Sequence, residues 1–182
     1  MKYIAYGSNM NLKQMKIRCP KSKVAGVGYI KGWKLYFNTY ADIKYTGNKE
    51  DVTPVVIWDI AKEDWAILDS YEGYPNYYTK EVIKTHFING NGKVIKTEKC
   101  IAYVMTDIRG NQYDRPFDSY VDGILVGYLQ HNINFEKLFE ALDYSERQRA
   151  RAVVRLYDSG AYYYVDRRTG KKLKWFLISQ TK

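Results

Sequence analysis

The stretch IAYGSNMN, residues 4–11, places a turn of small and polar residues directly after a short apolar run. Residues 2–6 have the pattern of a buried strand, and the residues after the turn follow helical spacing up to Pro20. Gly7 permits close approach to the backbone, and Gly-Ser-Asn is common turn chemistry. The stretch therefore predicts a strand–turn–helix unit whose turn presents backbone N–H groups, either as a simple turn or as a binding loop.

Strand patterns dominate the first hundred residues, and helical patterns concentrate after residue 117. The clearest turn is Asn-Gly-Asn-Gly at 89–92, which is typical of a hairpin. A polar, glycine-containing loop is expected at 42–53. Asp143 and Glu146 form a capping-box pattern, which predicts a new helix after residue 144. Further strands are predicted at 24–30, 33–40, 54–60, 77–88, 93–105, 161–166 and 172–178, and helices at 62–73, 119–132, 134–144 and 145–158. We expect an α+β fold, with a small, mostly antiparallel β-barrel and flanking helices.

The 182-residue length suits one domain with an appendage, and 46% hydrophobic residues suffice for a core. No apolar run approaches the length of a membrane span, and the N-terminus does not have the pattern of a signal peptide. Two cysteines, Cys19 and Cys100, do not suggest a disulfide framework. These features predict a cytoplasmic enzyme or binding protein without membrane association.

The positive charge is unevenly distributed. Residues 1–146 carry 19 Lys and Arg against 18 Asp and Glu, whereas residues 147–182 carry 10 against 2. We therefore expect a barrel domain over 1–146 and a basic C-terminal extension, a helix plus a hairpin, over 147–182.

Metal binding finds no support in the sequence. His86 and His131 are far apart and lack the spacing of metal ligands, and Cys19 and Cys100 have no ligating neighbour in sequence. Each cysteine lies in an apolar pattern, which predicts a buried, small hydrophobic side chain rather than a nucleophile. Ser8 lies outside any nucleophile-elbow motif. The carboxylates remain as candidates for chemistry.

Glu72 has an unusual setting in LDSYEGYPNYY, residues 68–78. A glutamate at a helix end is most often a solvated surface group. Here the carboxyl meets the negative end of the helix dipole, has aromatic neighbours in sequence, and precedes a sharp turn at Gly73 and Pro75. Burial and the dipole both raise a carboxyl pKa, as a general base working near neutral pH requires.

Three motifs follow one another along the chain: YGSNM after the first strand, LDSYEGYPNYY after a short helix, and AYVM on a later strand. Together they resemble the γ-glutamylcyclotransferase family. Their order and separations match the family through about residue 142 of this chain. YGSN alone is a weak signal, but together with the distant L-D-x-x-E-G-x-P and a following tyrosine it is fairly specific.

This resemblance implies a small β-barrel flanked by helices and a reaction without metal or organic cofactor. The α-amine of a γ-glutamyl group attacks its own γ-carbonyl, giving 5-oxoproline and a free amine or amino acid. The substrate that the resemblance implies is a small γ-glutamyl molecule. The motif reads Tyr-Gly-Ser-Asn-Met rather than the Tyr-Gly-Ser-Leu of glutathione-specific relatives, which argues against glutathione.

The resemblance also implies roles for individual residues. Glu72 is the expected catalytic base and acid. The expected substrate-binding residues are Tyr6, Gly7, Ser8, Asn9, Met10, Tyr78, Tyr103 and Tyr120. Tyr77 is the alternative to Tyr78, and ordinary core packing is the alternative for each tyrosine. Gly123 and Gly127, one turn apart, are expected to allow close helix–sheet packing.

A second hypothesis is a non-catalytic barrel that binds nucleic acid or another acidic partner through its basic C-terminal segment. A solvated helix and hairpin would carry the same charge. In the binding hypothesis, the residues that contact the acidic partner would be Arg147, Arg149, Arg151, Arg155, Arg167, Arg168, Lys171, Lys172 and Lys174. The identity of the γ-glutamyl substrate and the oligomeric state stay open, and we expect the leaving-amine pocket to be formed by loops such as 42–52 and by the extension.

Overall fold

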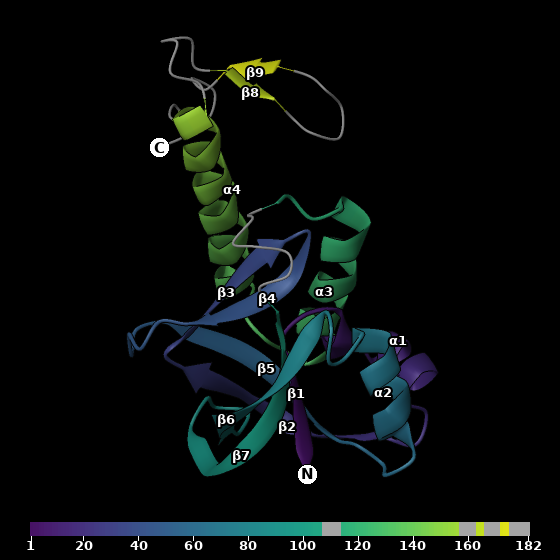
Figure 1. The fold of residues 1–182 in the computed structure, drawn as a ribbon. Coiled ribbons are helices and arrows are strands. Elements are labelled where there is room, and N and C mark those ends of the chain that lie inside the picture. Colours follow the sequence, from purple (N-terminus) through teal and green to yellow (C-terminus); the bar gives the residue numbers. More distant parts are fainter. Residues whose placement is uncertain (107–113, 157–162, 166–171, 175–182) are drawn as a thin grey trace.

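Five strands form a closed barrel in the order β1-β5-β2-β6-β7. The computed structural model describes residues 1–106, 114–156, 163–165 and 172–174 (Figure 1). The barrel strands are β1 (Lys2–Ala5), β2 (Lys23–Lys31), β5 (Val52–Asp59), β6 (Tyr78–Ile88) and β7 (Val94–Met105). Neighbours pair antiparallel except β1 and β7, which run parallel with Tyr3 opposite Ile101. The small, mostly antiparallel barrel and the hairpin around 89–92 are confirmed.

A second, two-stranded sheet joins β3 (Trp33–Asn38) to β4 (Tyr40–Tyr45). The prediction of one strand over 33–40 and a loop from residue 42 was wrong. Thr39 takes a left-handed conformation, with φ of 61°, and reverses the chain between the two strands. The Asp42 carboxylate is buried and accepts hydrogen bonds from the Tyr36 hydroxyl and the Met105 N–H, 3.0 Å away. These partners lie outside the segment 42–53, so the sequence of that segment alone predicted a solvated loop.

Helices flank the barrel on two sides (Figure 1). Short helices α1 (Leu12–Arg18) and α2 (Asp64–Glu72) lie side by side. Helix α3 (Asp118–Gln130) packs on the 3-10 turn η1 (Ser8–Met10), and α4 (Glu136–Leu156) packs on β3. None of the helices in the described part of the chain is long and apolar enough to cross a membrane.

Helix α4 is continuous where two helices were expected. Asp143 does not cap a new helix: its carboxylate pairs with the Arg147 guanidinium at 2.9 Å, one turn further along. The Ser145 hydroxyl donates to the Ala141 carbonyl and accepts the Phe37 N–H of β3, both at 2.8 Å. This buried serine links α4 to β3 by a hydrogen bond. The polar residue predicted to begin a new helix therefore lies in the middle of α4.

The C-terminal hairpin is confirmed, since β8 (Tyr163–Val165) pairs antiparallel with β9 (Lys172–Lys174). The expected boundary at residue 146 falls inside α4, and the division of the chain at that point stays a prediction. Of the nine basic residues assigned to partner binding, Arg147 is paired with Asp143. Arg149 is only 9% exposed, so it is a poor candidate for surface contact. The other seven side chains lie outside what the structure describes.

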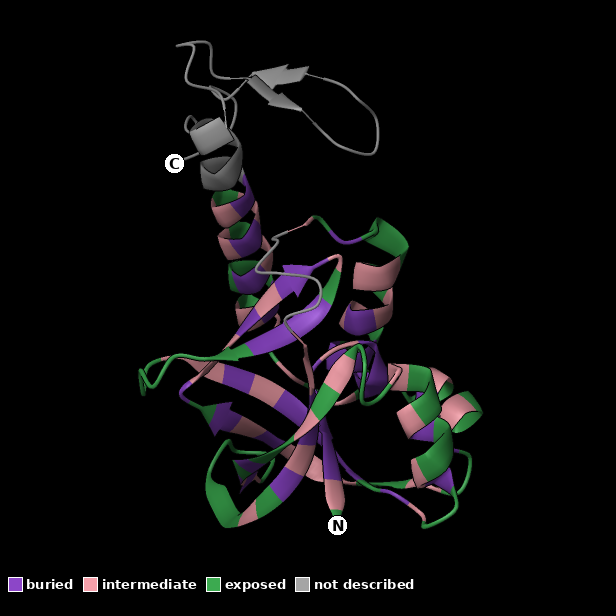
Figure 2. Cartoon of the chain, in the orientation of Figure 1, coloured by how far each residue is buried: buried purple, intermediate pink, exposed green. Residues whose placement is uncertain are grey.

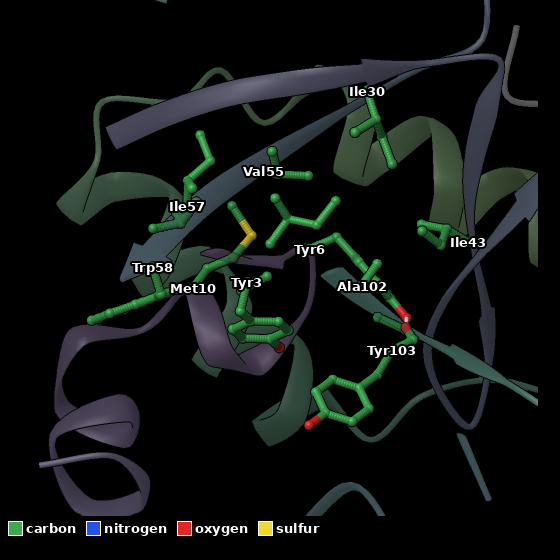
Figure 3. Close-up of a cluster of buried hydrophobic side chains, with 14 of the residues drawn as sticks. Tyr3, Tyr6, Met10, Ile30, Ile43, Val55, Ile57, Trp58, Ala102 and Tyr103 are labelled. Carbon is green, nitrogen blue, oxygen red and sulfur yellow. Dashed lines mark hydrogen bonds between the residues drawn. The ribbon is translucent and has the colours of Figure 1, made fainter. Parts of the chain in front are cut away.

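The core fills the barrel and continues under the helices. Figure 2 shows buried residues along β1, β4 and β5, with exposed residues at the β6–β7 hairpin tip. The close-up in Figure 3 includes Met10, Ile57 and Trp58, which lie together in this core.

Two glycines set how closely α3 approaches the turn. A Cβ on Gly127 would lie 2.7 Å from the Met10 Cβ and 3.0 Å from the Asn11 backbone nitrogen. A Cβ on Gly123 would meet only the end of the Gln14 side chain, 2.9 Å away. The Asn11 amide donates to the Gly123 carbonyl at 3.2 Å. The expected close packing therefore exists, but its partner is the η1 turn rather than the sheet.

We predict that Gly127→Ala lowers the free energy of unfolding by about 1–3 kcal/mol, because backbone cannot give way as a side chain can. Gly123→Ala is the matched control on the same helix. The Gln14 side chain can move aside and alanine favours helix, so this variant should be neutral or more stable by up to about 1 kcal/mol. Urea unfolding measures both. Equal stability of the two variants would show that α3 is not held tightly against the turn.

Candidate active site

A cavity of about 420 Å³ opens between the η1 turn, the end of α2 and the neighbouring strands. This size is typical of small-molecule sites. Eight of its fifteen lining residues are tyrosines, and Glu72 is the one carboxylate among them. The predicted site residues in the lining are Tyr6, Gly7, Ser8, Asn9, Glu72, Tyr78, Tyr103 and Tyr120.

The turn that follows β1 is held from several sides. The Met10 N–H donates to the Gly7 carbonyl at 2.9 Å, and the Trp58 indole N–H donates to the Asn9 carbonyl at 3.1 Å. A Cβ on Gly7 would lie 3.1 Å from the Ala41 Cβ and 3.2 Å from the Tyr120 hydroxyl. Glycine therefore lets β4 and α3 close around the turn.

Glu72 is the last residue of α2, and its side chain lines the cavity. Gly73 ends the helix in the left-handed conformation, with φ of 65°, and the Tyr74 N–H returns to the Asp69 carbonyl at 3.0 Å. This cap turns the chain away immediately after Glu72. The Glu72 carboxylate accepts a hydrogen bond from the Asn9 side-chain amide at 2.8 Å. The turn and the helix end, far apart in sequence, therefore meet at one polar contact.

Burial raises the pKa of Glu72 to about 7, while the Arg18 guanidinium and the hydrogen bond from Asn9 act in the opposite direction. Burial costs the ionised carboxylate its hydration, and only partial compensation is provided. The group is therefore poised to gain or lose a proton near neutral pH.

Arg18, which the sequence analysis did not select, lies beside this contact. Its Nη1 donates to the Ser8 hydroxyl at 3.2 Å and to the Asn9 amide oxygen. The guanidinium also lies over the Tyr71 ring, 3.9 Å from the ring centre. The only local feature of Arg18 is its place as the last residue of a lysine-containing helix, which gives no signal of a site.

The first backbone N–H groups of α1 already have partners within the protein. The Leu12 N–H donates to the Gln130 side chain at 2.8 Å, and the Asn11 side chain caps the N–H groups of Lys13 and Gln14. These partners satisfy the first turn, and it is Arg18, at the other end of the helix, that contacts the site residues.

The tyrosine hydroxyls have defined roles as donors and acceptors. The Tyr120 hydroxyl accepts a hydrogen bond from the Ala41 backbone N–H at 3.1 Å, so its own hydrogen remains available as a donor. Tyr103 donates to the Asp69 carboxylate, which also binds the Lys80 ammonium at 2.6 Å. Tyr103 can therefore only accept from a ligand.

Four of the cavity phenols have raised pKa values and are neutral near pH 7. Tyr6 donates to the Tyr103 carbonyl. Burial raises the pKa of Tyr3, Tyr6, Tyr103 and Tyr120, in the last case to about 12.

Met10 differs from the other predicted binding residues. It is completely buried in the core, packs against Gly127, and does not line the cavity. Tyr77 and Tyr78 both line the cavity, and Tyr77 is the more exposed of the two. The pocket expected from 42–52 is instead bordered by Tyr40 and Ala41, just before that segment.

Both cysteines are buried and unpaired, as predicted. Burial raises the pKa of the Cys19 thiol to about 11 and also raises that of Cys100. Among the residues that the structure describes, no three His, Cys, Asp or Glu side chains lie close enough together to hold a metal ion.

The family model "Gamma-glutamyl cyclotransferase, AIG2-like" matches residues 3–122. No curated protein sequence matches the chain. A solved structure called "Gamma-glutamyl cyclotransferase" is 23% identical, with a TM-score of 0.60 over 82% of this chain and 86% of that one.

Two further solved structures share the fold. An uncharacterized protein from Homo sapiens is 24% identical, with a TM-score of 0.59 over 82% of this chain and 86% of that one. YkqA from Bacillus subtilis is 18% identical, with a TM-score of 0.59 over 82% of this chain and 54% of that one.

The raised pKa of Glu72 predicts a specific pH dependence of stability. In the unfolded chain this carboxyl has its ordinary pKa of 4.5, whereas in the folded protein the pKa is about 7. Folding therefore favours the protonated form, and the wild type loses at most about 3 kcal/mol of stability as pH rises through this window. Glu72→Gln removes the titration, so its stability relative to wild type should increase by up to that amount between pH 4.5 and pH 8.

Urea unfolding at both pH values measures this difference. Glu81→Gln, at an exposed carboxyl on β6, serves as control and should differ from wild type equally at both pH values. A pH-independent difference for Glu72→Gln would mean that the Glu72 carboxyl is not destabilised by burial.

Proposed function

The chain belongs to the gamma-glutamyl cyclotransferase, AIG2-like family, and from this premise we propose that it converts a γ-glutamyl amine or γ-glutamyl amino acid to 5-oxoproline and a free amine. The family and the fold support a γ-glutamyl cyclotransferase-like activity in general. The observation that carries the specific proposal is the shared cavity of Glu72 and the turn at residues 7–9, joined by the Asn9–Glu72 hydrogen bond.

In the proposed reaction Glu72 carries protons from the attacking nitrogen to the leaving nitrogen. The substrate α-amine is an ammonium ion in water, and the Glu72 carboxylate removes its proton. The amine nitrogen then attacks the γ-carbonyl carbon, which forms the ring C–N bond. The original amide C–N bond breaks as the protonated Glu72 gives this proton to the leaving nitrogen. The ring nitrogen keeps one hydrogen and loses its second through the same carboxylate to the released amine, which departs as an ammonium ion. Atoms and charge then balance without water, and a carboxyl pKa of about 7 suits each transfer.

The turn and the tyrosines are proposed to bind the two negative groups. The substrate carries an α-carboxylate, and the tetrahedral intermediate carries an oxyanion. Backbone N–H groups of residues 7–9 and the free hydrogen of Tyr120 are suitable fixed donors. Gly7 leaves the backbone open to a close approach. Tyr6, Tyr78 and Tyr103 would complete the walls, with Tyr103 accepting from the substrate ammonium.

Cyclisation itself is a positioning problem. The γ-glutamyl chain must fold so that its two ends meet, and a tight, preorganised cavity removes most of the entropy cost. The leaving amine is proposed to extend toward the exposed tyrosines Tyr40, Tyr71 and Tyr77. This open side leaves room for amines of different size.

We predict that Glu72→Gln abolishes release of 5-oxoproline from γ-glutamyl amines and dipeptides while the protein stays folded. The amide retains the shape and can still accept from Asn9, but it cannot take up a proton. A loss of at least about 100-fold in kcat is expected. Chromatographic detection of 5-oxoproline across a panel of γ-glutamyl compounds measures it.

The control is again Glu81→Gln, which removes an exposed carboxyl that does not line the cavity and should retain wild-type turnover. Undiminished turnover by Glu72→Gln would end the assignment of Glu72 as base, and absence of turnover by the wild type on every compound would end the proposed function.

The pH profile gives a separate prediction. The base must be ionised in the free enzyme, so kcat/KM should fall tenfold per unit as pH drops below about 7 and level off above it. Steady-state kinetics from pH 5 to pH 8.5 measure this limb. An acid limb near pH 4.5 would indicate a solvated carboxyl instead.

A further inference from the structure

The side-chain amide of Asn9 is engaged at every polar position. Its nitrogen donates to the Glu72 carboxylate at 2.8 Å and to the Tyr3 hydroxyl at 3.0 Å. Its oxygen accepts from Arg18. The oxygen and nitrogen of an amide have nearly the same shape, so only the neighbours decide which way the group faces.

Arg18 is the neighbour that decides this. Tyr3 can donate or accept, and a carboxyl near its pKa can do either. A guanidinium can only donate. With Arg18 in place, the amide oxygen must face Arg18, and the NH2 group must face Glu72.

The guanidinium is itself held firmly. Its Cζ lies over the Tyr71 ring on α2, 3.9 Å from the ring centre, and its Nη1 donates to the Ser8 hydroxyl in the turn. It thereby connects α1, the turn and α2. A lysine ammonium lacks the plane that stacks on Tyr71, so it would reproduce only part of this arrangement.

We propose that Arg18 is a positioning residue, which locks the Asn9 amide in the orientation that donates to Glu72 and so holds the Glu72 carboxylate aimed at the substrate. This inference rests on the proposed role of Glu72 as base. Arg18 does not line the cavity and acts through Asn9.

Loss of Arg18 should act on Glu72 in two ways. The amide could turn over and accept from the protonated carboxyl, and a positive charge would be lost; both favour the protonated acid. Around Glu72, burial raises the pKa of the phenols of Tyr3, Tyr6, Tyr103 and Tyr120 and of the Cys19 thiol, so these groups are neutral near pH 7. Asp69 and Lys80 pair with each other beyond Tyr103, and Arg18 is the charge that shifts the pKa of Glu72.

The experiment compares Arg18→Met, Arg18→Lys and the control Lys13→Met, which removes an exposed positive charge from the same helix. Arg18→Met should lower kcat at pH 7 roughly tenfold or more with little change in KM. Its acid limb should move up by about one pH unit. Arg18→Lys keeps the charge and a donor, so the limb should stay in place and kcat should recover in part. Lys13→Met should match the wild type.

Carbon-13 NMR of the Glu72 carboxyl provides a readout that needs no turnover. The Glu72 midpoint should rise in Arg18→Met and stay in place in Lys13→Met. Arg18→Gln carries the same expected rise if Arg18→Met fails to fold. A midpoint unchanged from wild type would overturn the proposal for Arg18, even if kcat fell through general destabilisation. If the wild type forms no 5-oxoproline, the proposed function fails, and the NMR midpoints still decide whether Arg18 controls Glu72.

Discussion

The hydrogen bond between the Asn9 amide and the Glu72 carboxylate joins residues 63 positions apart in the chain, of which Asn9 is buried and Glu72 is half-buried. The turn that carries Asn9 is fixed by the Trp58 indole and by the close approach of α3 at Gly127. The helix that carries Glu72 ends at Gly73 in a conformation that glycine adopts without strain. The features of the site described above serve to bring these two ends together without solvent between them.

Barrel closure is what places the two ends side by side. Strand β1 lies between β5 and β7 and pairs parallel with β7. This pairing brings the rings of Tyr3 and Tyr103 into an edge-to-face arrangement, with their centres 5.7 Å apart (Figure 3). Tyr78 begins β6 opposite Met105 at the end of β7, so the segment after α2 returns to the same end of the barrel. The site is therefore built on paired strands, and only its turn and helix end need further support.

The sequence predicted those parts whose signals are local. The Asn-Gly turn, the helix ending at Gly73 and the strand before Gly7 are set by neighbouring residues, and the family motifs pointed to Glu72. Sequence-based prediction failed for residues whose structural role depends on partners distant in the chain. Asp42 was assigned to a loop because its hydrogen-bond donors lie on β3 and β7. Ser145 was placed at the start of a helix because the N–H group that its hydroxyl accepts lies on β3. Arg18 escaped notice for the same reason: its importance comes from Asn9 and Tyr71, not from its own helix.

The abundance of phenols around a single carboxyl has a consequence for charge. A phenol can supply a hydrogen at one moment and a lone pair at another by rotating about its C–O bond, and burial raises the pKa of Tyr3, Tyr6, Tyr103 and Tyr120. Neutral phenols can hydrogen-bond to a ligand nitrogen whether it is protonated or not. The cavity walls can therefore accommodate a change in the charge of the ligand without a change in their own net charge. Under the proposed function, Glu72 is the one carboxylate in the cavity lining, so it is the group that takes a proton from the arriving amine and returns it to the departing one.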